Sequence, residues 1–335
     1  MHKIAVIGAG GWGTTLSLLL AAKGNPVDLW CYEPEIALEI NEERTNTLYL
    51  PGIKLPKNIT ASIDLQKVCH DKHVLILAIP SQHLRGIVQQ IKPFMEEEAL
   101  ILIASKGLEV TTQKRLSEVV QEELQINSSR ILVISGPNHA EEVSRGIPTA
   151  TVVAGDLHNA GYLQECLVSE RFRVYTNRDL IGVELAGSLK NVITLAAGIS
   201  DGLGFGDNTK AALLTRGLAE ISRLGVALGA NPLTFSGLAG MGDLIGTATS
   251  KYSRNLWAGR EIGKGRNPQE VISSTKMVVE GFYTSKAASL LSKRVGIEMP
   301  ITEQIYAVLY GEQTPSDAVK ELMNREPKDE MEYFA

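Results

Sequence analysis

A glycine-rich turn near the start of the chain limits the possible folds more strongly than any other feature. A short apolar run at residues 3–7 is followed by Gly-Ala-Gly-Gly-Trp-Gly at residues 8–13 and then by an apolar run typical of a helix. In such a turn Gly8 permits the tight bend, Gly10 lets the backbone approach a pyrophosphate, and Gly13 lets the helix pack closely on the strand. The helix N-terminus then faces the anion. Because the turn joins a strand to a helix, the sequence predicts dinucleotide binding rather than only a tight connection.

The end of the second expected strand, Val27 to Cys31, bears on the choice of dinucleotide. An acid normally stands there and holds the ribose hydroxyls. In this chain the position is Cys31, and Glu33 follows two residues later. Glu33 can reach the ribose, and no arginine or lysine stands at 31–33 to attract a 2′-phosphate, which favours NAD over NADP. Alternatively, Glu33 caps the next helix, which Pro34 opens.

Further apolar runs rich in Val, Ile and Leu alternate with helical patterns through the first half of the chain. This alternation indicates a parallel, doubly wound sheet that is buried on both faces. The runs that we expect to be strands are Val74–Ile79, Ala99–Ala104, Arg130–Ser135, Thr149–Ala154 and Arg171–Tyr175.

Ligands of such sheets bind beyond the carboxyl ends of the strands, so the residues just past each strand are candidate site residues. Lys106 stands at one strand end, where it can bind a phosphate or carboxylate; a solvated lysine in a turn shows the same pattern. The sequence Ser-Gly-Pro-Asn-His-Ala at residues 135–140 offers free amides and the start of a helix. These features suit an anion or a cofactor amide, but they are also ordinary helix capping.

After Arg178 the strand pattern stops and helical periods dominate. We therefore expect an NAD(P)-binding Rossmann domain at residues 1–178 and an all-helical substrate and catalytic domain at residues 179–335, an α/β domain followed by an all-α domain. The helices that we expect, besides the one discussed next, include Thr111–Leu124, which would cover the sheet, Asn208–Leu228 and Thr284–Val295.

The stretch Val183 to Gly198 opens the second half and predicts a core helix with an unusual face. Bulky apolar residues gather on one side, whereas Lys190 shares the other side with small residues that include Gly187 and Gly198. Glycine inside a helix costs roughly 1 kcal/mol relative to alanine, so this face suggests close approach by backbone, substrate or cofactor. A desolvated lysine has a lowered pKa that suits it to proton transfer. The alternative is a lysine that extends to the surface along a closely packed helix.

Two loops in the second half carry further candidate residues. The glycine-rich run at residues 237–243 leads to Asp243, with Thr247 one turn later, and Asp243 either caps a helix or orients Lys190. The sequence Ser-Arg-Asn at residues 253–255 opens a helix. There Ser253 is the expected N-cap, and the next residue, an arginine, combines with free amides into an anion site unless the motif serves capping alone.

Composition and charge narrow the possible partners and location. The net charge of -5 argues against a nucleic-acid partner, because no basic field exists to neutralise phosphates. Cys31, Cys69 and Cys166 form no CxxC pair and indicate reduced thiols in a cytoplasmic protein. No apolar run approaches the ~20 residues of a membrane span, and no signal peptide is expected. His70 and His73 lie in a polar turn with no further ligand cluster, so we expect no metal site.

Several motifs taken together resemble a known family. In chain order they are GAGGWG, SKG, SGPNHA, GSLKN, GFGDNTKAAL, LAGMGD, YSRN and VVEG. In this order they span nearly the whole chain and resemble the bacterial type of NAD(P)-dependent glycerol-3-phosphate dehydrogenase. The resemblance implies reversible reduction of dihydroxyacetone phosphate to sn-glycerol 3-phosphate, the precursor for glycerophospholipid synthesis, by a Rossmann domain followed by a helical domain, usually as a homodimer.

The resemblance also implies residue roles. Lys190 is similar in position to the proton donor and acceptor, and Lys106 to a lysine shared between substrate and cofactor. Thr247 and Asn191 would support the catalytic group. The substrate site would further include Gly136, Asn138, Asp243, Ser253, Arg254 and Asn255. The cofactor would touch Gly11, Trp12, Ala140, Arg254, Val278 and Glu280, in addition to Gly8, Gly10, Gly13 and Glu33. Two positions depart from the family pattern: Asn138 stands where Ser or Thr is usual, and no basic residue follows the second strand.

Two other classes of protein share parts of this pattern. Dehydrogenases of β-hydroxyacids also join a Rossmann domain to helices and use a lysine, but they carry Lys-x-x-Asn, whereas here Asn191 follows Lys190 directly. A nucleotide-sensing protein without catalysis would need only the cofactor site. Lys190, Asp243 and Arg254 fall in three separate motifs, which favours an enzyme.

Overall fold

The computed structural model describes residues 2–330 and divides the chain into two compact units. Within the described residues, unit 1 consists of residues 2–105 and Leu116–Leu180, and unit 2 consists of Lys106–Arg115 and residues 181–330. The chain passes finally from unit 1 to unit 2 between Leu180 and Ile181. The excursion of Lys106–Arg115 into unit 2 has no counterpart in the prediction.

Unit 1 is built on an eight-stranded sheet with the strand order β3-β2-β1-β4-β5-β6-β7-β8. The strands are β1 Ile4–Ile7, β2 Val27–Trp30, β3 Ile59–Ser62, β4 Val74–Leu77, β5 Leu100–Ile103, β6 Ile131–Ser135, β7 Thr149–Ala154 and β8 Phe172–Asn177. Neighbouring strands pair in parallel, which confirms the predicted fold class, except that β6 and β7 are antiparallel. The connection between those two contains only the four-residue helix α6 Ala140–Val143, which is too short for a parallel crossover.

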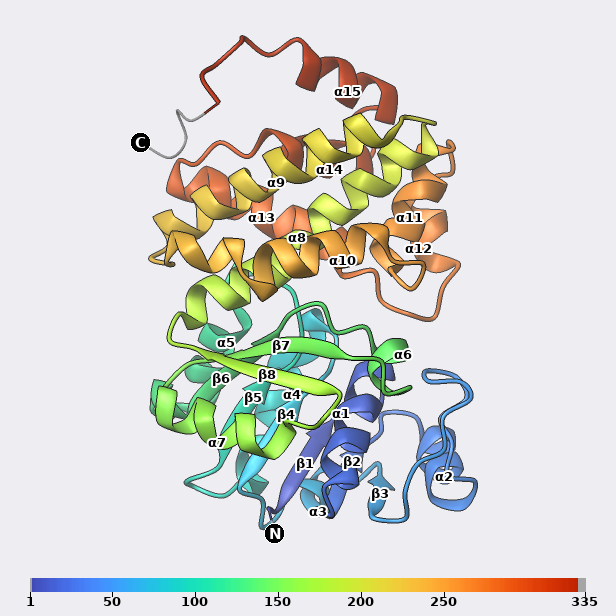
Figure 1. Cartoon of the computed structure of the whole chain (residues 1–335), viewed down its shortest axis with the longest axis vertical. Helices are drawn as coiled ribbons and strands as arrows, with labels where there is room; N and C mark the ends of the chain where they lie inside the picture. Colours follow the sequence, from blue (N-terminus) through green and yellow to red (C-terminus); the bar gives the residue numbers. More distant parts are fainter. Residues whose placement is uncertain (1, 331–335) are drawn as a thin grey trace. The chain divides into compact units, whose positions relative to one another are not determined.

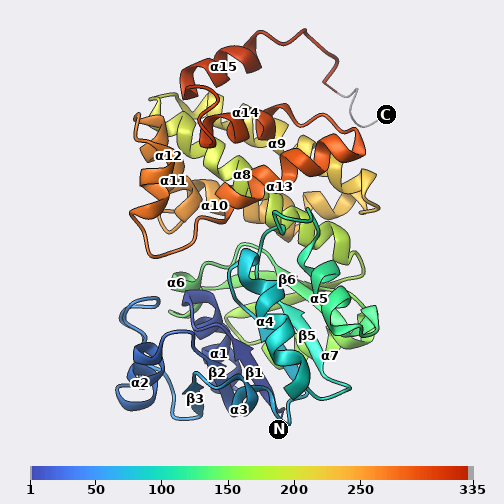
Figure 2. The same cartoon turned by 180° about the vertical axis from the view of Figure 1, so that it is seen from behind.

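Helices cover both faces of this sheet, with α1 and α7 on one side and α4 and α5 on the other (Figures 1 and 2). Strands β1 and β4 are buried at every residue, as expected for a sheet that is covered twice. The remaining elements of unit 1 are α1 Gly11–Ala22, α2 Pro34–Glu42, α3 Leu65–Cys69, η1 Ser81–His83, α4 Leu84–Ile91, η2 Lys92–Phe94, α5 Leu116–Leu124, η3 Ser128–Arg130 and α7 Leu157–Leu167.

The helix predicted over residues 111–124 begins only at Leu116, so the first part of that prediction is wrong. The preceding residues form a hairpin in which Leu108 and Arg115 pair as an antiparallel bridge. Gln113 has a positive φ of 56°, which a helix does not allow. The β-branched residues Thr111 and Thr112 favour this outcome, because they lose side-chain freedom in a helix.

Unit 2 is helical. Its elements are α8 Leu180–Gly202, α9 Asp207–Ala227, η4 Pro232–Ser236, η5 Leu238–Gly242, α10 Asp243–Thr249, α11 Arg254–Gly263, α12 Pro268–Ser273, α13 Glu280–Val295, α14 Pro300–Leu309 and α15 Pro315–Met323. Every residue of α8 from 182 to 200 is buried, so the predicted helix is the central core helix of this unit.

By length and composition, α8 is also the one helix of the described chain that could cross a membrane. An 18-residue window has a mean hydropathy of 1.4, and 89% of that window is buried within the protein. This helix is not an uninterrupted apolar run, so it does not contradict the prediction that no such run approaches the length of a membrane span. Polar and charged residues interrupt its 23 residues, among them Glu184, Lys190 and Asp201.

The backbone of α11 fills part of the small-residue face of α8. A Cβ atom on Gly198 would overlap the carbonyl oxygen of Leu256, and one on Gly259 would overlap that of Leu195. The sequence analysis predicts close approach to this face by backbone, substrate or cofactor, and at Gly198 the approaching group is the backbone of α11.

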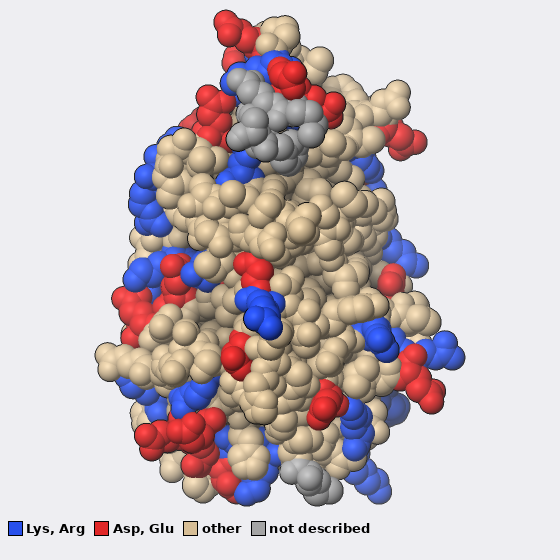
Figure 3. Space-filling view, turned by 60° about the vertical axis from the view of Figure 1, so that its left-hand side comes forward, with Lys and Arg blue, Asp and Glu red and all other residues tan. Residues whose placement is uncertain are grey.

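Charged side chains on the face shown in Figure 3 are interspersed, with basic and acidic groups near one another. No field of one sign therefore extends over that face.

Candidate functional site

Lys190, Asp243 and Thr247 meet in unit 2, although the first and last are 57 residues apart in sequence. The Lys190 Nζ donates to Asp243 Oδ1 at 2.9 Å and to Thr247 Oγ1 at 2.6 Å, and the threonine hydroxyl lies 3.0 Å from Asp243 Oδ1. Lys190 is 5% exposed and Asp243 is 2% exposed. The interpretation of Lys190 as a lysine that extends to the surface is therefore wrong.

Lys106 completes this cluster from the hairpin that follows β5. Its Nζ donates to Asp243 Oδ2 at 2.7 Å, so two ammonium groups lie on the two oxygens of one carboxylate. The Lys106 side chain is 18% exposed. It is thus an ion-paired, largely buried residue and not a solvated lysine in a turn.

Burial and the neighbouring charges together set the protonation of this cluster. Burial lowers the pKa of Lys190 to about 8; Asp243 opposes this effect and the charge of Lys106 adds to it. Burial alone would raise the pKa of Asp243, but Lys106 and Lys190 hold it below its ordinary value. Near neutral pH the carboxylate is therefore ionised, and the Lys190 amine can both give and accept a proton.

A glycine-rich turn places Asp243. The preceding element, η5, is one turn of π-helix that is closed by a bond from Gly242 N–H to the carbonyl oxygen of Gly237 at 3.1 Å. Within it Gly240 passes so close to Phe235 that a Cβ atom would overlap the Phe235 backbone. Widened turns of this kind are frequent at functional sites. The Asp243 carboxylate bonds Lys190 and is not the cap of α10, so the second of its two predicted roles matches the structure.

Asn191 and Asn255 form a separate pair that joins three helices. Asn255 Nδ2 donates to Asn191 Oδ1 at 2.9 Å, and the backbone N–H of Gly281 donates to Asn255 Oδ1 at 3.0 Å. These bonds connect α8, α11 and the start of α13. Asn191 therefore contacts the α11 helix through its side chain, whereas Thr247 and Asp243 contact the Lys190 ammonium.

The start of α11 carries the expected anion-binding features. Ser253 caps the helix by accepting a bond from Leu256 N–H at 3.2 Å. Arg254 follows at the first helical position, and its Nη1 donates to the carbonyl oxygen of Val278 at 3.4 Å; Glu280 begins α13 two residues further on. The first turn of α11 has no acidic residue, so the positive end of the helix is not neutralised from within.

Unit 1 holds the predicted cofactor turn, and its geometry fits a dinucleotide. A Cβ atom on Gly8 would lie 2.5 Å from the carbonyl oxygen of Ala78, and one on Gly13 would overlap that of Gly8, so both glycines are needed for the close packing. Gly10 differs, because no atom lies within 4 Å of its Cβ position. It precedes α1, whose first turn has neither a side-chain cap nor an acidic residue. Open space before an uncapped helix start suits a pyrophosphate.

Other predicted cofactor residues surround this turn. A Cβ atom on Gly11 would contact Ala140 Cβ at 3.6 Å, and the indole Nε1 of Trp12 is buried with no hydrogen-bond partner. Glu33 stands at the N-cap of α2 without making a side-chain cap; its Oε1 accepts a bond from the Tyr49 hydroxyl at 2.6 Å. Glu33 therefore occupies the N-cap position that the alternative gave it, with Pro34 next, although its side chain binds Tyr49 and makes no cap bond.

Gly136 and Asn138 follow β6, as predicted. Gly136 has a φ of 147°, which favours glycine. Asn138 Nδ2 donates to Thr151 Oγ1 at 3.1 Å, and that hydroxyl donates to the carbonyl oxygen of Ser135 at 2.8 Å. The unusual asparagine is thus anchored across the antiparallel β6–β7 pair.

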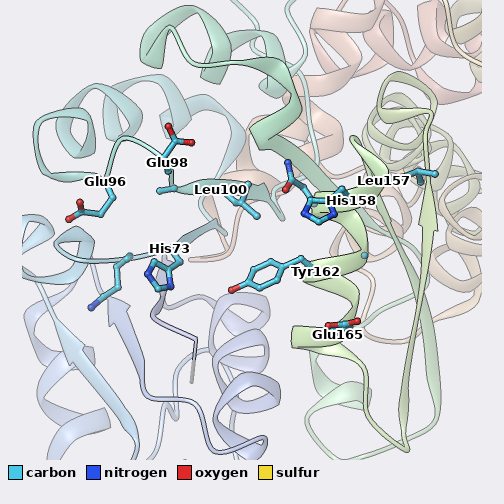
Figure 4. A pocket seen from close by; sticks show the side chains of 12 residues that line it. His73, Glu96, Glu98, Leu100, Leu157, His158, Tyr162 and Glu165 are labelled. Carbon is cyan, nitrogen blue, oxygen red and sulfur yellow. The ribbon is translucent and has the colours of Figure 1, made fainter.

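A hollow of about 680 Å³ in unit 1 lies at the amino ends of β4 and β5, away from the glycine turn (Figure 4). His73, His158 and Tyr162 are among its lining residues, and both histidines are exposed. It contains none of the predicted site residues. Within residues 2–330 no group of three or more His, Cys, Asp or Glu side chains is arranged to hold a metal ion.

The predictions from the sequence do not include the contacts that hold the Lys106 hairpin. Ser188 bonds Gly107, and Glu184 pairs with Arg115. Glu184 and Ser188 are one turn apart, and a polar pair at this spacing in an apolar helix was the signal available.

A Rossmann-type sheet with an open glycine turn and a helical unit with a buried, carboxylate-paired lysine define the class of nicotinamide-dependent dehydrogenases. Two family models match the chain: NAD-dependent glycerol-3-phosphate dehydrogenase N-terminus over residues 3–160, and the C-terminus of the same family over residues 179–320. The chain belongs to the NAD-dependent glycerol-3-phosphate dehydrogenase family, which confirms the predicted resemblance.

Individual relatives agree. The chain is 50% identical over 335 residues to glycerol-3-phosphate dehydrogenase (NAD(P)+) of Pelotomaculum thermopropionicum, covering 99% of this chain and 96% of that protein. It is 50% identical over 333 residues to the enzyme of the same name from Geobacillus thermodenitrificans, covering 99% and 97%. The crystal structure of glycerol-3-phosphate dehydrogenase from Coxiella burnetii is similar with a TM-score of 0.92 and 40% identity, covering 97% of this chain and 99% of that one.

Proposed function

We propose that this chain catalyses the reversible reduction of dihydroxyacetone phosphate to sn-glycerol 3-phosphate with NADH or NADPH, supplying glycerophospholipid synthesis. Relatives of the same length that are 50% identical carry the name glycerol-3-phosphate dehydrogenase (NAD(P)+). The observation that carries the proposal is the Lys190 ammonium. It has three N–H bonds, and protein acceptors at Asp243 and Thr247 account for two of them, so the third can point to a substrate oxygen.

The side chains of unit 2 perform the acid–base part of this reaction. The nicotinamide, when bound, supplies the hydride. Lys190 donates a proton to the ketone oxygen as negative charge develops there, and Asp243 keeps the ammonium oriented. In the reverse direction the neutral Lys190 amine removes the proton of the substrate hydroxyl. Lys106 adds a second positive charge beside the developing alkoxide.

Arg254 and the start of α11 are the proposed phosphate site, because a guanidinium there adjoins a helix N-terminus without acidic residues. We expect Arg254→Ala to raise the KM for dihydroxyacetone phosphate by about 10- to 100-fold, the loss of one charge-assisted contact. Arg260→Ala, on the same helix but paired with Asp201, is the matched control. An unchanged KM in Arg254→Ala would reject the assignment.

Other predicted roles remain proposals. The substrate would further contact Gly136, Asn138, Ser253, Asn255 and the two lysines, Lys106 and Lys190; Asn191 and Thr247 would support the catalytic group. The cofactor would contact the glycine turn, Trp12, Ala140, Val278 and Glu280. We propose a preference for NAD, since the carboxylate of Glu33 is held by Tyr49 close to the end of β2 and would repel a 2′-phosphate. Comparing kcat/KM for NADH and NADPH tests this preference.

We also propose a cytoplasmic homodimer. The three cysteines are unpaired and buried, as is usual in a reducing compartment. Leu233, Met241 and Ile245 are exposed on neighbouring elements of unit 2 and suit a protein interface. Light scattering coupled to size-exclusion chromatography gives the mass in solution, and a monomer would reject the dimer.

One assay tests the function. With dihydroxyacetone phosphate present, the oxidation of NADH or NADPH is followed by the loss of absorbance of the reduced nicotinamide. Turnover supports the proposal. Turnover of a β-hydroxyacid instead would identify the related dehydrogenase class, and cofactor binding without any turnover would identify a nucleotide sensor.

A further inference from the structure

The position of Lys106 depends on contacts that lie outside the proposed active site. Lys106 follows a strand of unit 1 but belongs to the hairpin Lys106–Arg115 of unit 2. A lysine at the base of a hairpin has many accessible conformations. Its ammonium can stay on Asp243 only if the hairpin is itself fixed.

Helix α8 fixes this hairpin near its first residue. The Ser188 hydroxyl accepts a bond from Gly107 N–H at 3.0 Å. It lies 3.0 Å from the carbonyl oxygen of Gly107 and 2.8 Å from that of Glu184, to either of which it can donate its one proton. Ser188 is 1% exposed, so these bonds are shielded from water. The residue next to Lys106 is thus held through its backbone.

The same helix also fixes the far end of the hairpin. Glu184, one turn before Ser188, accepts a bond from Arg115 Nη1 at 3.0 Å. The side chains of Arg115 and Glu184 are 15% and 3% exposed. Arg115 in turn pairs with Leu108 across the hairpin, two residues beyond Lys106. Breaking a buried pair of this kind leaves an uncompensated charge, so its effect on the local backbone is large.

We propose that Glu184 and Ser188 are positioning residues for the reaction: through Arg115 and Gly107 they hold the Lys106 ammonium on Asp243, opposite Lys190. This inference rests on the proposed function. It adds a second role to α8, which carries Lys190 itself and also determines where the second ammonium lies. Helix α8 therefore helps to determine the positions of both ammonium groups, and the Asp243 carboxylate lies between them.

Their spacing affects the proton donor directly. The charged groups that act on Lys190 are Asp243 from α10 and Lys106 from the hairpin, and the charge of Lys106 lowers the pKa of Lys190. When Lys106 moves away, this effect weakens and the pKa of Lys190 rises. A change in the pH profile therefore distinguishes a positioning role from a loss of stability.

The experiment compares wild type with Ser188→Ala and Glu184→Gln. We expect kcat/KM for dihydroxyacetone phosphate to fall by about 10- to 100-fold, as for a small misplacement of a site group, with the basic limb of its pH profile displaced to higher pH. Arg115→Lys should retain more activity than Arg115→Met, because it keeps the charge. Asp201→Asn is the matched control, since Asp201 pairs with Arg260 and Lys210 at the other end of α8. It should leave the pH profile unchanged.

The outcomes separate the two proposals. If wild type does not turn over the ketone, the proposed function fails. If wild type is active while folded Ser188→Ala and Glu184→Gln keep both kcat/KM and the basic limb, the positioning role is rejected. If Glu184→Gln does not fold, Ser188→Ala alone decides the question, because it removes only one hydroxyl. A variant with a lower melting temperature but an unchanged pH profile of kcat/KM would also reject the positioning role.

Discussion

At the scale of single residues, the protonation of Lys190 is the property from which the chemistry follows. An isolated buried lysine would lose its proton, and a lysine ion-paired at the surface would keep it over the whole useful pH range. In this chain burial and Lys106 act against Asp243, and the balance lowers the pKa of Lys190 to about 8. The same amine can then act as acid and as base near neutral pH.

This pKa has opposite effects on the two directions of the reaction. Ketone reduction needs the protonated amine, so its kcat/KM should be highest below pH 8 and fall as the pH rises through about 8. Oxidation of the alcohol needs the neutral amine, so its kcat/KM should rise over the same range. Initial rates of both directions across pH 6 to 10 check this, roughly two units on either side of the transition. Two profiles that change in the same sense would contradict the assignment of Lys190.

At the scale of elements, α8 and α11 are joined by contact between their backbones. Gly198 and Gly202 of α8 face Gly259 and Gly263 of α11, and a Cβ atom at any of the four would overlap backbone of the other helix. Such contact needs no large side chains, and it fixes the distance between the helix that carries Lys190 and the helix that begins with Arg254.

We therefore expect Gly198→Ala to destabilise unit 2 by about 1–3 kcal/mol, because the two helices must separate. Gly86→Ala is the contrasting variant: Gly86 is exposed in α4 and no atom lies within 4 Å of its Cβ position. It should stabilise its helix by about 0.5–1 kcal/mol. Thermal and urea unfolding measure both changes, and equal effects of the two substitutions would show that the backbone contact does not control stability.

A second helix junction is pH-sensitive. Glu220 of α9 is 2% exposed and accepts bonds at the start of α14 from Ile301 N–H at 2.6 Å and Thr302 N–H at 3.2 Å. Burial raises the pKa of Glu220 to about 7, although these amides and the charge of Arg223 oppose the change. The cost of burying the charge therefore exceeds the gain from capping the helix.

The sign of the stability effect follows. Because the folded-state pKa lies above the unfolded value, this group's contribution to the free energy of unfolding is complete below about pH 4.5 and is lost as the pH rises through 7. The loss is on the order of 3 kcal/mol. Glu220→Gln cannot ionise and should lack this part of the pH dependence in urea unfolding at pH 5 and pH 8. Parallel stability profiles for wild type and Glu220→Gln would contradict the expectation.

At the scale of the whole molecule, the sequence predicts the elements whose pattern is contained in a few neighbouring residues. It does not predict the contacts between segments that are far apart in the chain. The strand pattern and the glycine turn predict the sheet of unit 1, because burial on both faces and the turn are encoded within a few residues. The hairpin that carries Lys106 was missed, since its structure depends on Glu184 and Ser188, which lie far along the chain. The meeting of Lys190 with Asp243 was anticipated only as one of two alternatives, because no local pattern states which partner a carboxylate will find.

The glycine turn lies in unit 1, whereas Lys190 lies in unit 2. We therefore predict that one substitution can abolish cofactor binding and another can abolish turnover, each without the other. Gly10→Ala places a methyl group where no protein atom lies within 4 Å, so the melting temperature should be unchanged. The affinity for NADH should fall by about tenfold or more, because the methyl group occupies the expected position of the pyrophosphate. Lys190→Met should bind NADH as wild type does, yet lose about 10²- to 10⁴-fold in kcat, since it removes the proposed proton donor. Fluorescence titration with NADH and initial rates measure the two quantities on both variants. Normal NADH affinity in Gly10→Ala would remove the pyrophosphate from this turn, and full turnover in folded Lys190→Met would remove the lysine from the reaction.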